Sequence, residues 1–422
     1  MKQKFIILKE QAYSAKEVGK IKQFSYEKMG WNAHAKDPLF PWKGFDASPV
    51  LPSRLEWETG EFSREEAQQL KDQPDILDIV PSMDMNIIRP TKKEVLPAAA
   101  AAGPAWGLGD TGVVAGGYTG KGITVAVLDT GINKNHDAFA HLNILEKDFT
   151  GEGDGDRDGH GTHCAGTIAG GAVNGTEIGV APGIERLLVG KVIGQQGGSS
   201  NDILDAMKWA VAQKANVISM SLGVDFTSYI KRLHQQYGMP LELASSLALE
   251  DYRKTIGMFE RVVAEYEYGS INENIAPLII VAASGNESRR ELQPDFKIAT
   301  APPAVSQGII SVAAVGASPQ GWYIAPFSNT RATLCAPGVD ILSAGLGTDD
   351  LVRMSGTSMA TPHVAGIAAL WAEKLKQEQR LNYMGLRGQL VSSSRIQGLL
   401  NYAQVDYGLG MVTAPAAPVA AV

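Results

Sequence analysis

The chain from Gly122 onward alternates short apolar runs with segments of helical spacing. The apolar runs are continuous, as in ITVAVLD at 123–129, RLLVGKVI at 186–193 and LIIVAASGN at 278–286. Strands that are apolar on both faces are typical of a parallel sheet covered by helices on each side. We therefore predict a doubly wound α/β domain with a mostly parallel sheet, whose functional residues lie at the carboxyl ends of the strands.

Residues 1–98 have a smaller pattern, which predicts a separate β/α domain. Ser63 and Glu66 have the spacing of a capping box, in which each side chain bonds the backbone N–H of the other residue. A helix is therefore expected to begin there. The expected elements are two strand–helix rounds and a final pair of strands, at 5–8, 14–26, 54–57, 63–73, 76–83 and 85–90.

Two other segments depart from these patterns. Residues 91–105 lack a periodic core pattern, which predicts an exposed linker that proteases can reach. We place the end of the first domain at residue 98, with the linker reaching about 104 and a second domain over 105–422. Residues 224–275 contain long amphipathic segments, of which one part is a helix that the fold requires and the rest is an insertion. The insertion is expected to act as a stabilising helical flap or, alternatively, to narrow a cleft or dock a partner.

Composition and charge limit the classes of function. The 422 residues are 44% hydrophobic and 20% charged, as in soluble globular proteins, and the net charge is -7 without a dense Lys/Arg block. This balance argues against nucleic acid as a partner. No apolar run approaches the roughly 20 residues that span a bilayer, so no membrane is expected. The N-terminus MKQKFIILKEQ does not resemble a secretory signal, which predicts a cytoplasmic protein or one whose signal has been removed.

Asp129 is followed by Thr and Gly, and a second Asp-Thr-Gly begins at Asp110. Two such motifs raise the possibility of the paired carboxylates of an aspartic protease. That enzyme needs one lobe for each aspartate, and two aspartates nineteen positions apart leave no room for a lobe. Asp110 also lacks a preceding apolar strand, and Asp and Gly favour turns. We therefore predict a turn at Asp110 and another role for Asp129.

Three glycine-rich blocks carry the residue types of a nucleophilic triad, namely VLDTG around Asp129, DGHGTHCAG around His160 and SGTSMATPHVAG around Ser358. A serine becomes a nucleophile when a histidine takes its proton, and a buried carboxylate fixes the tautomer of that histidine. Ser358 precedes an apolar helix with Pro362 in its expected first turn, and a helix N-terminus favours the negative charge of a tetrahedral intermediate. Asn286, just beyond a strand, could donate its amide to the same oxyanion, beside the Ser358 N–H.

With these blocks in the order Asp, His, Asn, Ser, residues 105–415 resemble a subtilisin-like serine protease, and HGTHCAG resembles its proteinase K branch. The resemblance implies that Asp129 orients His160, which acts as general base and then acid. It implies Ser358 as the nucleophile and Asn286 as the oxyanion donor. It also implies a substrate-binding edge, at Gly197, Gly198, Ser199, Ser221, Leu222 and Gly223, and a first specificity pocket, at Ala283, Ser284 and Ala301.

The function implied by the resemblance is hydrolysis of peptide bonds in proteins through an acyl-enzyme on Ser358, without a catalytic cofactor. Residues 1–98 are similar to the inhibitory propeptide of the same family, a ferredoxin-like α+β domain whose tail occupies the active site until it is cut. The expected partners are protein or peptide substrates and the chain's own propeptide, with a cut within about residues 91–104. The alternative is a catalytically silent binding module that residues 1–98 cover permanently.

Metal binding stays open at this point. His163 has the spacing of a zinc partner for His160, but the pattern His-Glu-x-x-His is absent. The acidic loop at 154–159 matches the first half of a calcium-binding loop and fails at the twelfth position, Ala165. Relatives of this family often bind structural calcium, so a structural calcium ion is kept as a possibility. Cys164 is expected to be a small buried hydrophobe rather than a catalytic group.

Overall fold

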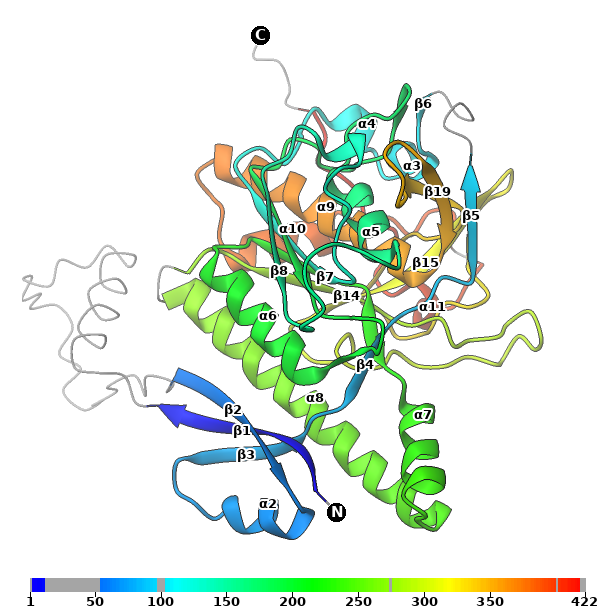
Figure 1. Cartoon of the computed structure of the whole chain (residues 1–422). Helices are drawn as coiled ribbons and strands as arrows, with labels where there is room; N and C mark the ends of the chain where they lie inside the picture. Colours follow the sequence, from blue (N-terminus) through cyan, green and yellow to red (C-terminus); the bar gives the residue numbers. More distant parts are fainter. Residues whose placement is uncertain (1, 12–53, 97–102, 273–274, 400, 418–422) are drawn as a thin grey trace, which may run out of the picture.

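The computed structural model describes residues 2–11, 54–96, 103–272, 275–399 and 401–417. A large body carries a small sheet and a pair of projecting helices at one end (Figure 1). The helix expected at 14–26 lies outside the described residues. Within the described part of the chain, no helix combines the length and apolarity needed to cross a bilayer.

The body is built around an eight-stranded sheet. Its strands are β7 (Thr124–Asp129), β8 (Ile144–Asp148), β10 (Arg186–Lys191), β12 (Val217–Met220), β14 (Ile279–Ala283), β15 (Ile310–Ser318), β16 (Gly321–Ile324) and β17 (Leu334–Pro337). They follow the order β16-β15-β14-β12-β7-β10-β8, with β17 also paired to β15. Neighbouring strands are parallel except at β15–β16. The mostly parallel sheet is therefore as predicted.

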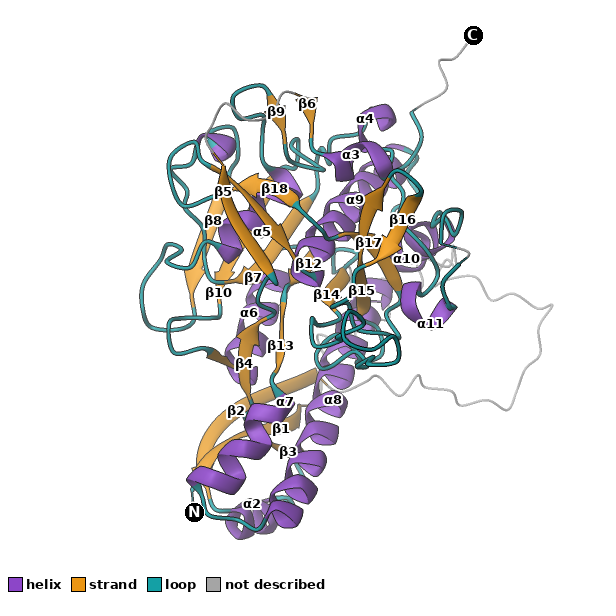
Figure 2. Ribbon diagram, turned by 90° about the vertical axis from the view of Figure 1, so that its right-hand side faces the viewer, coloured by secondary structure: helices purple, strands orange, loops and turns teal. Residues whose placement is uncertain are grey.

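Helices cover both faces of this sheet (Figure 2). The helices that cover it are α5 (His160–Ala169), α6 (Ser200–Ala212), α8 (Leu241–Asn272) and α9 (Thr357–Gln377). Val125 and Val127 of β7 belong to the same core as α5 and α9, whereas Ala126 and Leu128 share a core with α6 and α8. Because neighbouring side chains of a strand point to opposite faces, the four residues 125–128 of β7 are all apolar. The doubly wound α/β prediction is confirmed.

The N-terminal residues form a small antiparallel sheet. Its elements are β1 (Gln3–Gln11), β2 (Arg54–Phe62), β3 (Ile76–Pro81) and the helix α2 (Arg64–Leu70), with the strand order β2-β1-β3. The predicted capping box is present: Glu66 N–H donates to Ser63 Oγ at 3.2 Å, and Ser63 N–H donates to the Glu66 carboxylate at 2.7 Å. One face of the sheet packs on α2, and the other joins the core that contains α6 and α8.

The strands expected at 76–83 and 85–90 do not pair with each other. The second of them, β4 (Asp84–Ile87), instead lies antiparallel between β11 (Gly198–Ser199) and β13 (Leu222–Val224). The next segment was expected to be an exposed linker, and residues 91–95 are exposed, but its first part is a regular strand, β5 (Lys92–Leu96), beside β19 (Leu351–Ser355). Both corrections have one cause, since edge strands of the body offer unpaired N–H and C=O groups that an extended segment can bond. Residues 97–102 of the expected linker lie outside the residues that the structure describes.

The remaining elements are short or peripheral. They are β6 (Gly103–Pro104), β9 (Thr176–Glu177), β18 (Ile341–Ala344), α3 (Trp106–Asp110), α4 (Val113–Gly116), α7 (Phe226–Lys231), α10 (Tyr383–Ser392) and α11 (Gln404–Tyr407). Two single-turn helices lie at Asp137–Phe139 and Arg232–Gln236. The helical character predicted for 224–275 is thus present in α7 and α8.

Candidate active site

Asp129 and His160 meet at the carboxyl edge of the central sheet. Asp129 is the last residue of β7 and His160 the first residue of α5, and both are buried. Asp129 Oδ1 lies 2.7 Å from His160 Nδ1 and also accepts the N–H of Thr130 at 2.8 Å. Among the described residues, none hydrogen-bonds His160 Nε2. The dyad therefore leaves one buried imidazole nitrogen available for a proton.

Two opposing effects act on the protonation of His160. Burial is the largest single effect and lowers its pKa, but the Asp129 carboxylate and Cys164 together raise it further, so the pKa lies well above the ordinary 6.5. The carboxylate thus stabilises the imidazolium that forms when the histidine accepts a proton.

Asp156 holds the start of α5 in place. Its Oδ1 accepts from Thr130 Oγ1 and from the N–H groups of Asp158 and Gly159, each at 2.9 Å. Its Oδ2 accepts the N–H and the hydroxyl of Thr162 at 2.9 and 2.7 Å. The turn after β7 and the first turn of α5 are therefore tied to one carboxylate. The sequence pattern matched only the first half of a calcium-binding loop and gave no sign of this role.

Ser358 is the second residue of α9 and is buried. Pro362 is the sixth residue of α9, not part of its first turn as predicted. Because proline has no N–H, it cannot bond the carbonyl of Ser358 four residues earlier. That carbonyl instead accepts from Ser221 Oγ at 2.9 Å and from Cys164 Sγ at 3.5 Å.

The hydroxyl of Ser358 points toward Met359 Sδ, at 3.3 Å, rather than toward His160. Cys164 Sγ lies 4.0 Å from His160 Nδ1 and 3.5 Å from the carbonyl oxygen of Ser358, so the serine lies beside the dyad, but the hydrogen bond between serine and histidine is not formed in this state. Catalytic hydrogen bonds are often long or misaligned until a substrate is bound productively. Cys164 is buried, and burial raises the pKa of its thiol, as expected for a packing residue.

Asn286 lies just beyond β14, and its side chain lies near the hydroxyl of Ser358. Its Oδ1 accepts both the N–H and the hydroxyl of Thr357 at 2.9 Å, and its Nδ2 donates to the carbonyl of Arg89 at 2.9 Å. A methyl group on Gly356 would lie 2.8 Å from Ser358 Oγ and 2.9 Å from Asn286 Nδ2. The serine hydroxyl and the asparagine amide therefore flank one small space, which a glycine leaves open.

Residues 84–91 of the chain itself run through the cleft beside these groups. Asn86 pairs with Gly223, Ile87 pairs with Leu222, and the N–H of Ile88 donates to the carbonyl of Ser221 at 3.0 Å. On the other side, Met85 pairs with Gly198 and Asp84 with Ser199. Five of the six predicted edge residues thus bond or pair with this extended segment, whereas Gly197 pairs with Gly194.

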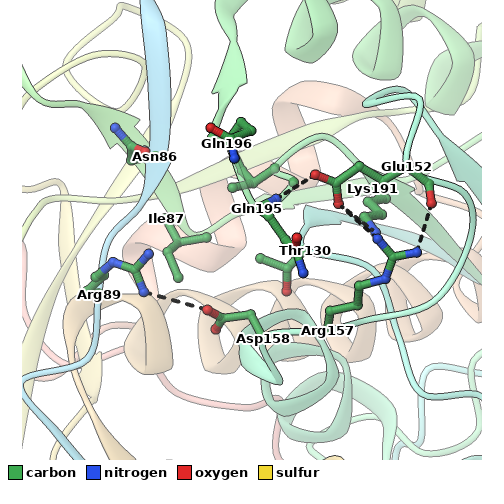
Figure 3. A pocket seen from close by; sticks show the side chains of 13 residues that line it. Asn86, Ile87, Arg89, Thr130, Glu152, Arg157, Asp158, Lys191, Gln195 and Gln196 are labelled. Atoms are coloured by element: carbon green, nitrogen blue, oxygen red, sulfur yellow. Dashed lines mark hydrogen bonds and ion pairs between the residues drawn. The ribbon is translucent and has the colours of Figure 1, made fainter.

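Two cavities flank this segment. The first has a volume of about 560 Å³ and contains the three predicted pocket residues, Ala283, Ser284 and Ala301, together with Gly223 and Ile88. The second, of about 440 Å³, is lined by Gly197 and several charged side chains (Figure 3).

Ion pairs organise the second cavity. Within it, Glu152 pairs with the buried Lys191 at 3.4 Å and with Arg157 at 3.6 Å, while Arg89 reaches Asp158 at 3.6 Å.

Comparison with known proteins decides the family. The model of the subtilase family matches residues 120–411. The chain belongs to the subtilase family. Similar proteins include the intracellular serine protease of Paenibacillus polymyxa, 33% identical over 258 residues that cover 60% of this chain and 67% of the relative. The major intracellular serine protease of Bacillus subtilis strain 168 is 34% identical over 264 residues, 60% of this chain and 69% of the relative. Subtilisin Savinase of Lederbergia lenta is 33% identical over 309 residues, 71% of this chain and 92% of the relative.

This subtilase is therefore a serine endopeptidase that hydrolyses proteins, as the sequence analysis predicted. The resemblance to a subtilisin-like protease and the expected α/β fold are both confirmed.

His163, which has the sequence spacing of a zinc partner for His160, is held by backbone carbonyls. His163 is buried and its Nε2 lies 3.0 Å from the carbonyls of both Ile341 and Val352, while burial lowers its pKa to about 3. The spacing to His160 thus places the two rings in different hydrogen-bond networks. In the described chain, the cluster with metal-ligating atoms is Asp129, His160 and Cys164, which contains the dyad itself.

Thr357 gives the first testable prediction. Thr357→Val removes one of the two donors to Asn286 Oδ1 and keeps the backbone N–H. The side-chain amide of Asn286 should then be held less firmly in the orientation that bonds the oxyanion. We expect kcat to fall roughly tenfold, the size of one hydrogen bond, with KM unchanged. Asn286→Ala should lower kcat roughly 100- to 1000-fold, a magnitude taken from subtilisin. If Thr357→Val lowers kcat further in the Asn286→Ala background, Thr357 does not act through the amide.

Proposed function

We propose that Asp129, His160 and Ser358 form the catalytic triad of this subtilase, that Asn286 is its oxyanion donor, and that the chain is made as a self-inhibited zymogen. The observation that carries the zymogen proposal is the path of residues 84–96. This segment pairs with β11 and β13, passes Asn286, and then pairs with β19. A protein substrate would have to displace it.

Each half of the proposed reaction needs one proton transfer to His160 and one from it. Ser358 Oγ attacks the substrate carbonyl carbon and gives its proton to His160 Nε2, and Asp129 stabilises the resulting imidazolium. Asn286 Nδ2 and the backbone N–H of Ser358 bond the oxyanion. His160 then gives the proton to the leaving nitrogen, the peptide bond breaks, and an acyl-enzyme remains. Water, activated by His160 in the same way, hydrolyses the ester and restores the serine. This chemistry uses no cofactor, and structural calcium stays a prediction.

The register of the cleft segment supports inhibition rather than cleavage. In productive binding, the residue that fills the first pocket also presents the carbonyl that is attacked. Here Ile88 and Arg89 both line the pocket, and Ile88 donates its N–H to Ser221, but the carbonyl that Asn286 bonds belongs to Arg89. The bond to the edge strand and the bond to the proposed oxyanion donor are thus made by neighbouring residues. The next residue, Pro90, has a fixed φ and no N–H, which limits how the segment can rearrange.

Pro90→Ala tests this register. Alanine lets the backbone relax, so we expect a new cut near Ile88 or Arg89 and a release of the N-terminal fragment at least about tenfold faster. Fragment masses over time report both effects, and Pro90→Ala combined with Ser358→Ala is the matched control. If Pro90→Ala is cut only at the wild-type position and at the wild-type rate, the proline does not protect the segment.

The triad itself is tested by a serine-directed phosphonate. In protein that has lost residues up to the linker, we expect the reagent to label Ser358 and abolish peptidase activity. Labelled protein that keeps its activity, or cut protein without label at Ser358, would contradict the assignment. A chain that stays whole and inactive even after trace protease is added would favour the silent binding module.

A further inference from the structure

The helices α7 and α8 form an arm that projects from the body beside the N-terminal sheet (Figures 1 and 2). We define the helical arm as residues 226–272. Ala248, Phe259 and Val262 of this arm belong to the same core as Ile6 and Val80 of the N-terminal sheet. The arm is therefore a docking surface for this sheet, away from the cleft that holds residues 84–96.

A fully buried carboxylate lies at this docking surface. Asp251, on α8, has no exposed surface. Arg64 donates to both of its oxygens, from Nη1 to Oδ1 at 3.0 Å and from Nη2 to Oδ2 at 2.5 Å. Tyr229, on α7, donates its hydroxyl to Oδ2 at 2.7 Å. Carboxylate and guanidinium thus form the bidentate pair that arginine makes and lysine cannot.

The two partners of this pair come from different parts of the chain. Arg64 is the first residue of α2 in the N-terminal domain, whereas Asp251 and Tyr229 both belong to the arm. If the N-terminal domain leaves, Asp251 keeps the hydroxyl of Tyr229 but loses both guanidinium bonds. Departure therefore has to break two charge-assisted hydrogen bonds at this point, and such bonds are stronger than those between neutral groups.

Other polar contacts join the N-terminal domain to the arm and to α6. Trp57 donates to Asp205 at 2.8 Å, Lys208 pairs with Glu56, and the N–H of Leu55 donates to Glu265 at 3.1 Å. The N–H of Met83 also donates to Ser200 Oγ at 3.1 Å in a buried hydrogen bond. Ion pairs in contact with water contribute little to affinity. Among the described ion pairs of this interface, the pair with Asp251 has a carboxylate without exposed surface, whereas Glu56 is 31% exposed, so the contact with Asp251 is the buried ionic anchor.

We propose that Asp251 and Tyr229 form a guanidinium socket, which retains the N-terminal domain on the enzyme through Arg64 after the linker has been cut. The inference rests on the proposed self-inhibition and adds a second anchor outside the cleft. A substrate can compete for the cleft but not for the socket. While Arg64 stays bound, the cleft segment remains at a high effective concentration and rebinds after each displacement. Inhibition then ends only when the socket opens.

The experiment measures release of the N-terminal fragment without any catalysis. The full-length chain carries Ser358→Ala, and residues 97–102 are replaced by the recognition sequence of a site-specific protease. After cutting with that protease and dilution, native mass spectrometry follows the loss of the fragment with time. The variants are Arg64→Ala, Arg64→Lys, Asp251→Asn and Tyr229→Phe. Lys254→Ala is the matched control, because Lys254 lies on the same helix and pairs with Glu250 at 2.9 Å.

Arg64→Ala and Asp251→Asn are each expected to speed release about 30-fold or more, since truncation of one partner of a buried charge pair acts mainly on the dissociation rate. Their combination should be no faster than the faster single variant. Arg64→Lys keeps the positive charge but cannot form the bidentate pair, so its release rate should be intermediate. The release rate of Lys254→Ala should match that of the parent. Release at the parent rate in Arg64→Ala and Asp251→Asn would overturn the socket, as would equal effects of Lys254→Ala.

Two further measurements separate failure of folding from failure of the proposal. Thermal melting of the uncut chains shows whether Arg64→Ala still folds, and Tyr229→Phe perturbs the socket without removing a charge. In chains that keep Ser358, the delay before peptidase activity appears should shorten in Arg64→Ala. Faster release without any activity would contradict the proposed function but support the socket. Peptidase activity combined with an unchanged release rate in Arg64→Ala would support the proposed function and contradict the socket.

Discussion

Ser358→Ala is expected to leave the chain whole and to abolish peptidase activity, by a factor on the order of 10⁶ as for the nucleophile of subtilisin. The physical reason is that the neighbouring hydroxyls are engaged elsewhere, since Thr357 Oγ1 donates to Asn286 and Ser221 Oγ donates to the carbonyl of Ser358. Intact mass should show the wild type losing a fragment that ends in the linker, within about residues 91–104. Activity on a denatured protein substrate measures the second effect.

Ser355→Ala is the matched control for this experiment. Ser355 lies three residues before Ser358, and its hydroxyl accepts the N–H of Asp340 at 2.8 Å rather than facing the dyad. We expect this variant to process itself at the wild-type rate. If wild type and Ser358→Ala both stay whole, self-processing is wrong and an outside protease must act. If both are cut alike, the linker is merely accessible.

Asp129→Asn is expected to lower kcat of the processed enzyme by roughly 10⁴-fold, the magnitude for loss of the orienting carboxylate in serine proteases. The asparagine amide no longer holds the imidazole tautomer whose Nε2 can accept the serine proton. The variant should still fold, because Asn and Asp have nearly the same shape. Its activity has to be measured after removal of the N-terminal domain, since self-processing will also be slow.

The pH profile gives a second, independent signature of Asp129. His160 must be neutral to act as a base, so activity falls as the pH drops through its pKa. In the wild type Asp129 holds that pKa well above 6.5, whereas in Asp129→Asn burial remains and lowers it. The acidic limb of kcat/KM should therefore move to lower pH in the variant. Asp158→Asn, which changes an exposed carboxylate near the cleft, should leave the limb in place. If the acidic limb does not move, Asp129 does not set the pKa of His160.

The same shift affects stability with a defined sign. The pKa of His160 is raised in the folded state, so the pair with Asp129 stabilises the fold fully below the unfolded pKa of about 6.5. This contribution is lost as the pH rises through the folded pKa. The dyad therefore becomes less stabilising over the pH range in which the histidine becomes an active base.

The sequence by itself determined the features that depend on neighbouring residues. Continuous apolar runs such as 123–129 identified strands buried on both faces, because a parallel sheet leaves no polar face. Ser63 and Glu66 identified a helix start, since their hydrogen bonds span three residues. Asp129 and His160 could be expected to meet because strand ends and helix starts share one edge of such a sheet.

Only the tertiary structure decided which distant groups become partners. Segment 84–96 has the pattern of a strand and a linker, and nothing local reveals that β11, β13 and β19 bond it. Thr357 and Asn286 are 71 positions apart, and Arg64 and Asp251 are 187 apart. Hydrogen bonds at such separations depend on how whole elements pack, and the periodicity of a sequence does not encode that packing. The sequence therefore determined which chemical groups the site contains. Packing decided how these groups are oriented, which segment covers them and which contacts hold that segment in place.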